Sequence, residues 1–424
     1  MVADDESKSA EGLFGKKRES ELEHRPFKAL FTGDIHMNNA LPHAKPDHSR
    51  YCGKLGLTDR MVDQIMLFKE IKQIIKVHEL DALYILGDLF DHGKLDVITL
   101  NETADCIRAI SEIVPVYLLP GNHDAHTTEG LRFNLEAIAS LCTNVFCLRS
   151  KTSLGEPWQG NTPGWCRDWL HFYPMEYMPL NATRDQLGLF RESLAFTAML
   201  SPGKSLAPIQ NILLIHNAIN GCKHGDWICD VGLHADDVCY GFDRVLASHF
   251  HTHQTFGPDN RGMYLSAPMH HRFDDCGRPT YVWIGEFRRG APPSFTSVTT
   301  TTPRFYELEY GDDMSELAGL RERDYLRIRV TATQPDWLEL QPVLNELVES
   351  MQERCINASV LHRPVYHHKS RIFSEATAAK TEISILDNIQ DYVNSEYVDT
   401  GSLDKAKLAA LGREILSKSE KAAT

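Results

Sequence analysis

The sequence predicts an α/β protein built around a wound sheet, followed by a smaller α/β unit. Three short apolar segments, residues 27–32, 82–86 and 114–119, have the length and composition of buried strands. Helical patterns separate them, and this alternation is typical of a wound sheet. Each segment leads into a turn rich in Gly, Asp, Asn or His, so polar side chains should gather outside the carboxyl ends of the strands.

The connections between these strands are predicted to be helices. In residues 59–79 apolar side chains recur at helical spacing, and Thr58 is placed to cap the N-terminus. Residues 97–113 show a second helical pattern. The first half of the chain is therefore expected to alternate strand, helix, strand, helix and strand.

The strand pattern continues in the second half of the chain. Residues 211–215 lead directly into His216, and residues 244–247 are soon followed by His249. Residues 263–266 form a third short apolar run. Further strands that end close to histidines are therefore predicted.

Five parts are predicted along the chain. A strand at 325–330, a helix at 337–351 and a strand at 358–365 would form the smaller α/β unit. Two amphipathic stretches, 382–397 and 403–418, would form a helical tail that either docks on a partner or folds back on its own domain. The parts are a disordered polar tail (1–26), the main domain (27–287), an irregular linker rich in Pro, Ser and Thr (288–303), an α/β cap (304–375) and the helical tail (376–424).

Composition limits the class of protein. The chain has 424 residues, 44 Lys and Arg against 58 Asp and Glu, and 42% hydrophobic residues, as in an ordinary globular protein. No apolar run is long enough to cross a membrane, and the polar first 26 residues do not form a secretory signal, so a cytoplasmic protein is expected. The formal charge of −14 disfavours a protein that binds nucleic acid without a partner, because binding to phosphates needs positive surface.

The ten cysteines are expected to be reduced thiols, because the sequence has no CxxC pair. One cluster mixes cysteine and histidine, but its spacing fits no standard zinc pattern. Its members are Cys222, His224, Cys229, His234 and Cys239.

Histidine is the most informative residue type, with twenty in the chain and eight between His216 and His271. Polar motifs stand at the ends of the predicted strands, and together they form a specific signal. They are DIH (Asp34, His36), GDLFD (Asp88, Asp91), GNHD (Asn122, His123, Asp124), His216, and SHFH (His249, His251).

This series resembles the DxH, GDxxD, GNHD/E, H and GHxH motifs of the calcineurin-like metallophosphoesterases, and the resemblance covers residues 27–283. It implies a two-sheet sandwich flanked by helices, with two divalent metal ions. Mn²⁺ is the favoured ion, with Mg²⁺ and Fe²⁺ as alternatives, because carboxylates, imidazoles and an amide oxygen form the donor set. The implied ligands are Asp34, His36, Asp88 and His251 for one ion, and Asp88, Asn122, His216 and His249 for the other.

The resemblance also implies roles for residues that bind no metal. His123 would be the general acid that protonates the leaving oxygen, and Asp91 would orient it. Asp124 is expected to support its loop. Ser248 replaces the usual Gly of GHxH, which is expected to disturb close packing there. Other nearby histidines match no ligand position and are expected to support the site or lie on the surface: His92, His126, His253, His270 and His271.

Within the superfamily, GDLFDHGK, VPVYLLPGNHD and the cap with its tail look most like SbcD-type nuclease subunits, bacterial or phage-encoded. This implies a metal-dependent DNA exo- or endonuclease in repair, recombination or phage DNA processing. The implied partner is an SbcC-type, SMC-like ATPase that binds a homodimer of this chain in a heterotetramer, with no membrane involved. The alternatives are a phosphatase or phosphodiesterase for small nucleotides or phosphoproteins, and a non-catalytic scaffold. A polar insertion at 38–57 would either contact DNA or remain a solvated loop.

Overall fold

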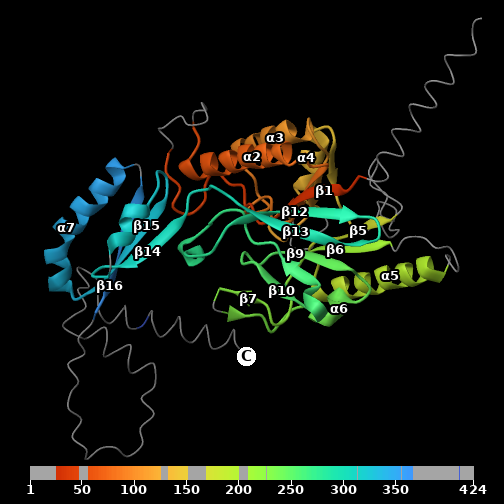
Figure 1. Ribbon diagram of the computed structural model, residues 1–424. Coiled ribbons are helices and arrows are strands. Elements are labelled where there is room, and N and C mark those ends of the chain that lie inside the picture. The colour runs from red at the N-terminus through yellow and green to blue at the C-terminus, as the bar shows by residue number, and fades with distance from the viewer. Residues whose placement is uncertain are drawn as a thin grey trace, which may run out of the picture. The chain divides into compact units, whose positions relative to one another are not determined.

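The computed structural model describes residues 25–46, 56–125, 132–150, 169–199, 209–225, 227–312, 314–354, 356–365 and 410 (Figure 1). All the helices and strands given below lie in one compact unit, residues 1–365. Most of the predicted N-terminal tail, residues 47–55 of the polar insertion, His126 and, except for residue 410, both amphipathic stretches of the C-terminal tail lie outside the described residues. In the described part of the chain, no helix combines the length and apolar character needed to cross a membrane.

The first sheet has six strands, and its four parallel strands set the frame for the site. Strands β1, β2, β3 and β4 run parallel, while β12 pairs antiparallel with β1 and β13 pairs antiparallel with β12. In spatial order the strands are β13 (Ala291–Thr299), β12 (Tyr281–Arg288), β1 (Phe27–Thr32), β2 (Ala82–Leu86), β3 (Val116–Leu119) and β4 (Val145–Cys147).

The second sheet has five strands. Strands β5, β6, β9 and β11 run parallel, and β10 is antiparallel to β11. In spatial order the strands are β10 (Gln254–Phe256), β11 (Gly262–Tyr264), β9 (Arg244–Ser248), β6 (Gln210–His216) and β5 (Leu170–Met175). A separate short hairpin joins β7 (Lys223–His224) to β8 (Trp227–Ile228).

An aromatic core binds the two sheets together. Phe31, Tyr84, Tyr117 and Phe146 stack across β1 to β4, with ring centroids 5.0, 4.7 and 5.3 Å apart. Phe172 of β5 lies 5.0 Å from Tyr84 and so connects the sheets. Such pairs add to the hydrophobic gain from burial, and the facing sheets confirm the predicted sandwich.

Helices cover the outer faces of the sandwich (Figure 1). Thr58 caps the first of them and accepts a hydrogen bond from Met61 N, as the sequence predicts. Helices α2 to α4 share one apolar core with the first sheet, and α5 and α6 share another with the second sheet. Their bounds are α2 (Asp59–Val77), α3 (Val97–Ser111), α4 (Leu135–Leu141), α5 (Leu180–Met199) and α6 (Ala235–Cys239). Short 3₁₀ segments follow at Pro258–Asn260, Phe273–Asp275 and Met314–Gly319.

A three-stranded parallel sheet and one helix form the described part of the predicted cap. Helix α7 packs against this sheet over an apolar core of its own, with Leu344 and Met351 buried. The bounds are β14 (Phe305–Glu309), β15 (Tyr325–Ala332), α7 (Gln334–Glu353) and β16 (Asn357–Pro364).

The expectation of an irregular linker at 288–303 is wrong. Strand β13 occupies most of it, pairs with β12 and forms an edge of the first sheet. Proline is tolerated at a sheet edge, because an edge strand need not donate all its N–H groups. The prolines that suggested a loop, Pro292 and Pro293, are therefore compatible with the strand.

Candidate metal centre

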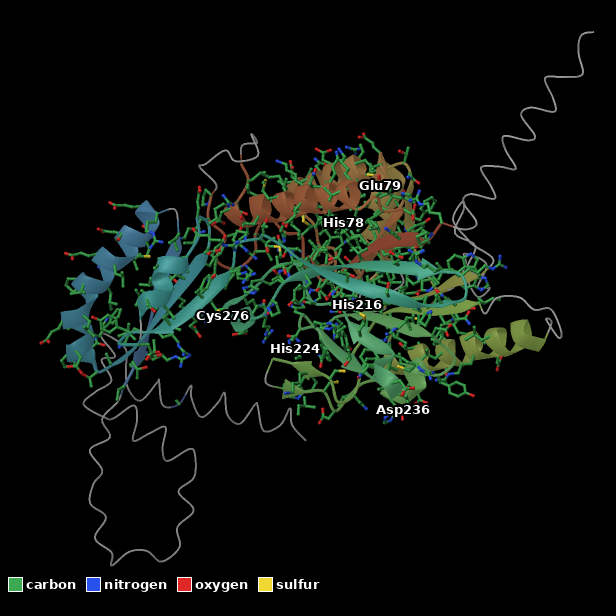
Figure 2. The ribbon with its side chains drawn as sticks, in the orientation of Figure 1. His78, Glu79, His216, His224, Asp236 and Cys276 are labelled. Atoms are coloured by element: carbon green, nitrogen blue, oxygen red, sulfur yellow. The ribbon has the colours of Figure 1, made fainter. Side chains whose placement is uncertain are left out.

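The parallel strands bring all the predicted site residues to one edge of the sandwich. The turns after β1, β2 and β3 carry the first half of the motif series, and β6 and β9 carry the second half. The carboxyl ends of parallel strands meet at the same edge, so side chains distant in sequence become neighbours. Figure 2 shows His216 among the strands at this edge.

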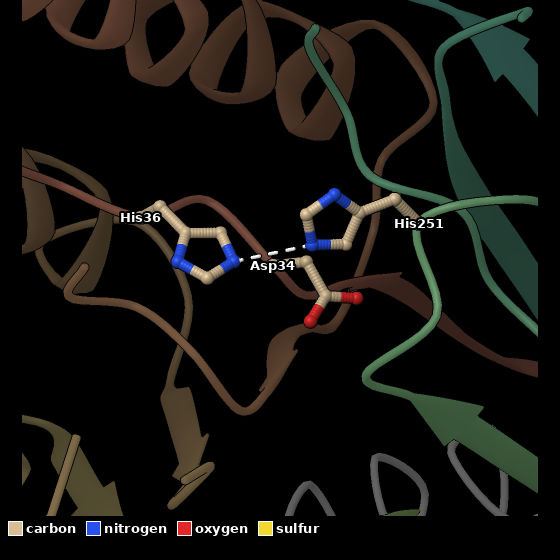
Figure 3. A group of neighbouring side chains, drawn as sticks. All are labelled: Asp34, His36 and His251. Carbon is tan, nitrogen blue, oxygen red and sulfur yellow. Dashed lines mark hydrogen bonds between the residues drawn. The ribbon is translucent and has the colours of Figure 1, made fainter. Parts of the chain in front are cut away.

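Three overlapping groups of side chains each present donor atoms within 4.8 Å of one another, a spacing at which they could hold a cation. The groups are Asp34 with His36 and His251, His36 with Asp88 and His123, and Asp88 with His216 and His249. In the first group the three side chains point toward one another (Figure 3), and the Nε2 atoms of His36 and His251 lie 3.3 Å apart. Carboxylates and imidazoles suit a divalent first-row metal.

Asp88 lies between two of these groups. Its Oδ2 is 3.3 Å from His216 Nε2 and 3.9 Å from His36 Nε2, while its Oδ1 accepts a hydrogen bond from His123 N at 2.9 Å. The amide oxygen of Asn122 lies 3.1 Å from His216 Nε2 and 3.0 Å from His249 Nδ1. Asp88 is therefore shared by two of the donor groups, and its two oxygens could offer a ligand to each.

Burial acts against the charged form of the imidazoles in this site. It lowers the pKa of His249 to about 3, with His216 adding to the effect, and lowers the pKa of His36 well below its ordinary value. For His216, the Asp88 carboxylate outweighs burial and raises the pKa to about 9. An imidazole binds a metal in its neutral form, and the lowered pKa values keep His36 and His249 in that form. A cation bound at His216 would first have to displace a proton.

The backbone is strained at four of the predicted ligands. Asp34, His36, Asp88 and His249 have φ angles of 51°, 54°, 50° and 115°. Only a few per cent of residues other than glycine adopt positive φ. Such conformations cost about 1–3 kcal/mol each and concentrate at functional sites.

Glycines leave room for two of the site residues. A Cβ atom on Gly87 would lie 2.1 Å from Nδ1 of the His216 ring, and its φ of 92° also favours glycine. A Cβ atom on Gly33 would lie 2.1 Å from the Ser248 hydroxyl oxygen. The sequence predicts that Ser248, in place of the usual Gly, disturbs the packing here. Gly33 leaves room for the Ser248 side chain, because it has no Cβ atom.

Ser248 contributes to the site instead of disturbing it. Its hydroxyl donates a hydrogen bond to Oδ2 of Asp34 at 2.7 Å, and His249 N lies 3.1 Å from the same oxygen. Both donors fix the direction of the Asp34 carboxylate. A hydrogen bond to a ligating carboxylate orients it toward the metal.

We expect Ser248→Ala to weaken divalent-cation binding by about 10-fold or more, because the Asp34 carboxylate loses a fixed donor. Competition with a fluorescent chelator measures the affinity directly. Ser111→Ala is the matched control, because it removes a buried hydroxyl of α3 that donates to Arg108 O and belongs to no donor group. Equal cation affinity in wild type and Ser248→Ala would show that the hydroxyl has no such role.

His123 lies beside the predicted ligands, and its ring is fixed by the main chain. Its Nδ1 is 2.5 Å from the carbonyl oxygen of Asp91. The Asp91 carboxylate instead accepts a hydrogen bond from Asn38 Nδ2 at 3.0 Å and lies 3.6 Å from His36 Nδ1. The position of Asp91 thus fits the expected orienting role, but the group that contacts His123 is its carbonyl.

Three further residues support the site, and the sequence identifies them to different extents. Gln64 of α2 donates to His36 O at 2.6 Å and to Ile35 O at 3.2 Å, although no motif marks it. Buried His271 contacts Asp34 O through Nε2 at 2.8 Å, and was expected only as a supporting or surface residue. Asp124 accepts hydrogen bonds from Phe90 N and Gly121 N, which confirms that it supports the loop.

The remaining histidines and cysteines form no further donor group among the described residues. His92 is exposed, and His253 and His270 bond carbonyl oxygens. Cys222, Cys229 and Cys239 are buried in the apolar core under the second sheet. Burial raises the pKa of the Cys222 and Cys239 thiols to about 11, so they are protonated at neutral pH.

A cavity of about 1010 Å³ opens over the centre. It is lined by predicted site residues on one side, and by the β7–β8 hairpin and residues 271–278 on the other. Its size is at the upper end for small-molecule sites. A substrate larger than one small metabolite therefore has room beside the metal donors.

A family model described as calcineurin-like phosphoesterase matches residues 27–271, more than half of the chain. The chain therefore belongs to the calcineurin-like phosphoesterase family, whose members are metal-dependent hydrolases of phosphoester bonds with a dinuclear metal site. The donor groups described above fit such a site.

Among curated relatives, the SbcD component of the SbcCD nuclease of Escherichia coli K12 is 22% identical over 312 residues, which cover 66% of this chain and 72% of the relative. The UDP-2,3-diacylglucosamine hydrolase of Shewanella pealeana is 33% identical over 100 residues, which cover 23% of this chain and 33% of that protein.

Two solved structures are also similar. A dimetal phosphatase from Danio rerio has a TM-score of 0.38 and 10% identity, covering 64% of this chain and 99% of that chain. The Pseudomonas putida nuclease MPE has a TM-score of 0.26 and 14% identity, covering 64% of this chain and 87% of that chain.

Proposed function

We propose that this chain is a dinuclear-metal-dependent DNA nuclease. The observation that carries the proposal is the extent of similarity to the SbcD component of the SbcCD nuclease. The similarity covers 66% of this chain, a larger share than residues 27–271 make up. It therefore continues beyond the segment that the phosphoesterase family model matches. The donor groups at the strand ends are compatible with phosphodiester hydrolysis.

We assign one ion to Asp34, His36, Asp88 and His251, and the other to Asp88, Asn122, His216 and His249. The contacts of Asp88 with His36 and His216 support its place as the bridge. Mn²⁺ is the proposed ion, because imidazoles and carboxylates together favour it over purely oxygen-bound cations.

Two cations held here would supply positive charge to the scissile phosphate and an activated water for in-line attack. His123 then supplies the proton that the departing sugar oxygen needs. Its Nδ1 contacts Asp91 O, so the ring is held with Nε2 as the free nitrogen. His123 also lines the cavity, as a proton donor to substrate must.

We further propose that the chain works in the cytoplasm with an SbcC-type, SMC-like ATPase, as a homodimer within a heterotetramer. The role would be DNA repair, recombination or phage DNA processing. The formal charge of −14 supports a partner, because an acidic chain needs positive surface from elsewhere to hold a phosphate backbone. Residues 376–424 are the proposed docking segment for this ATPase.

We expect His123→Ala to lower the rate of Mn²⁺-dependent cleavage of labelled linear and hairpin DNA by about 10²–10⁴-fold, with metal content unchanged. Hydrolysis of bis(p-nitrophenyl) phosphate should fall much less, because its leaving group needs no proton. His92→Ala is the matched control, since His92 is an exposed histidine of the same strand-end region. An equal loss with both substrates would contradict the role of His123 as the acid.

A second candidate function is hydrolysis of a small nucleotide-linked phosphoester. The local 33% identity to UDP-2,3-diacylglucosamine hydrolase favours it. Turnover of nucleotides or nucleotide diphosphate conjugates, with no cleavage of DNA in Mn²⁺, would select this function over the nuclease.

A further inference from the structure

The β7–β8 hairpin places an exposed aromatic side chain in the cavity of the metal donors. Trp227 of this hairpin is 51% exposed and lines the same cavity as His36, Asp88 and His123. The ring of neighbouring His224, labelled in Figure 2, lies 6.2 Å from the His251 ring between centroids, so the hairpin lies close to one of the donor groups. About half of the Trp227 surface is therefore open to solvent, on the side chain that lines the cavity.

The base of the hairpin is firmly anchored. Lys223 N donates to Gln254 Oε1 at 2.7 Å, and Gln254 Nε2 donates to Lys223 O at 2.8 Å. Cys222 and Cys229 flank the hairpin and are buried in the core, and Cys229 N donates a hydrogen bond of 2.8 Å to Cys222 O. The cysteine-rich segment that fits no zinc pattern therefore serves to hold this exposed hairpin in place.

Cationic side chains share the cavity wall with Trp227. Lys223 and Arg272 are exposed there, and neither makes an ion pair with any residue that the structure describes. Arg278 is paired with Asp275 at 3.0 Å, and Asp274 is the exposed acidic group on this wall. Two exposed cations beside an indole form a surface suited to phosphates and a planar ring.

We propose that this hairpin is a stacking platform for an unpaired nucleobase adjoining the scissile phosphate, with Trp227 against the base and Lys223 and Arg272 against flanking phosphates. The inference rests on the proposed nuclease function and names its substrate class. A base offers its face to an indole only when it is unstacked, so the platform selects single-stranded or frayed DNA. Stacking depends little on base identity, so no sequence preference is expected.

The first test measures binding in EDTA, so that cleavage plays no part. We expect Trp227→Ala to weaken binding of a fluorescent single-stranded oligonucleotide by about 10-fold or more, and Trp227→Phe to restore most of it. A blunt duplex of the same sequence should change by less than about 2-fold. Tyr240→Ala is the matched control, because Tyr240 is also exposed, at 69%, but lines a different hollow.

The second test uses salt dependence to examine the cations. The binding constant K for the single strand is measured over a range of salt concentrations. Lys223→Gln and Arg272→Gln should each make the slope of log K against log salt concentration shallower by about 0.7, the value for one phosphate contact to a single strand. Unchanged slopes would remove these two residues from the proposal. Asp274→Asn should leave the slope unchanged or make it slightly steeper.

The outcomes separate this inference from the nuclease proposal. If wild type cleaves DNA while Trp227→Ala binds single strands as wild type does, the platform is wrong and the nuclease stands. If wild type hydrolyses bis(p-nitrophenyl) phosphate but neither binds nor cleaves DNA, both are wrong. If Trp227→Ala weakens single-strand binding while wild type cleaves nothing, the hairpin binds single strands, but the nuclease proposal and the place of the base beside a scissile phosphate both fail.

Discussion

Asp88→Asn is expected to reduce bound metal from two ions to at most one per chain and to lower phosphodiesterase activity by more than His123→Ala does. Asn has one carbonyl oxygen and no charge, so it cannot hold two cations as a carboxylate can. Asn also tolerates positive φ, so the backbone at this position, with φ of 50°, is not the cause of the effect. Metal content by mass spectrometry and hydrolysis of bis(p-nitrophenyl) phosphate check both expectations.

The matched control for this variant is Asp274→Asn. Asp274 is an exposed carboxylate of the same cavity and belongs to none of the donor groups. It should keep two ions and full hydrolysis. Two ions and near-normal turnover in Asp88→Asn would exclude Asp88 as the bridge and would require a different assignment of ligands.

Asp63→Ala is expected to lower the free energy of unfolding by about 3–5 kcal/mol, because it removes the buried carboxylate that faces the guanidinium groups of Arg60 and Arg323. Asp63 is 1% exposed and accepts hydrogen bonds from Arg323 Nη2 at 2.6 Å and Tyr325 OH at 3.2 Å. Fully buried Arg60 lies 3.6 Å away, with its guanidinium 5.0 Å from the Phe305 ring centroid. Chemical denaturation of the metal-free chain measures the loss.

Asp259→Ala is the control for this measurement. Asp259 is 83% exposed in a pair with Arg261, so its removal should change the free energy of unfolding by less than about 1 kcal/mol. Burial raises the pKa of Asp63 to about 6 against the pull of Arg60 and Arg323, so the denaturation is best run at pH 7.5, where Asp63 is ionised. A loss no larger than that of Asp259→Ala would mean that this buried network does not stabilise the fold.

The same network links the predicted cap to the centre. Asp63 lies on α2, whereas Arg323 and Tyr325 belong to the cap sequence. The next residue of α2, Gln64, holds the carbonyl of His36. Asp63 is therefore one residue away from Gln64, the side chain that holds the backbone of a predicted metal ligand.

The strands and the candidate ligands could be predicted from sequence because each is a local pattern. A buried parallel strand is a short apolar run, and the ligands follow such runs directly, as His216 follows the apolar residues of β6. Strand β13 could not be predicted in this way, because an edge strand is half exposed and tolerates Pro292 and Pro293.

The residues that support the centre could be predicted only in part, because their roles depend on contacts distant in sequence. Gln64 is 28 residues from His36, and Ser248 is 214 residues from Asp34. For Ser248 the sequence showed a departure from the family motif but not its purpose. The spacing of Asp91 and His123 likewise could not show that a carbonyl, and not the carboxylate, makes the contact.

The positive φ angles of Asp34, His36, Asp88 and His249 place a cost in stability at the donor groups. Glycine would adopt these angles without that cost, but it has no side chain to offer a cation. Cation binding and fold stability therefore make opposite demands on these four positions.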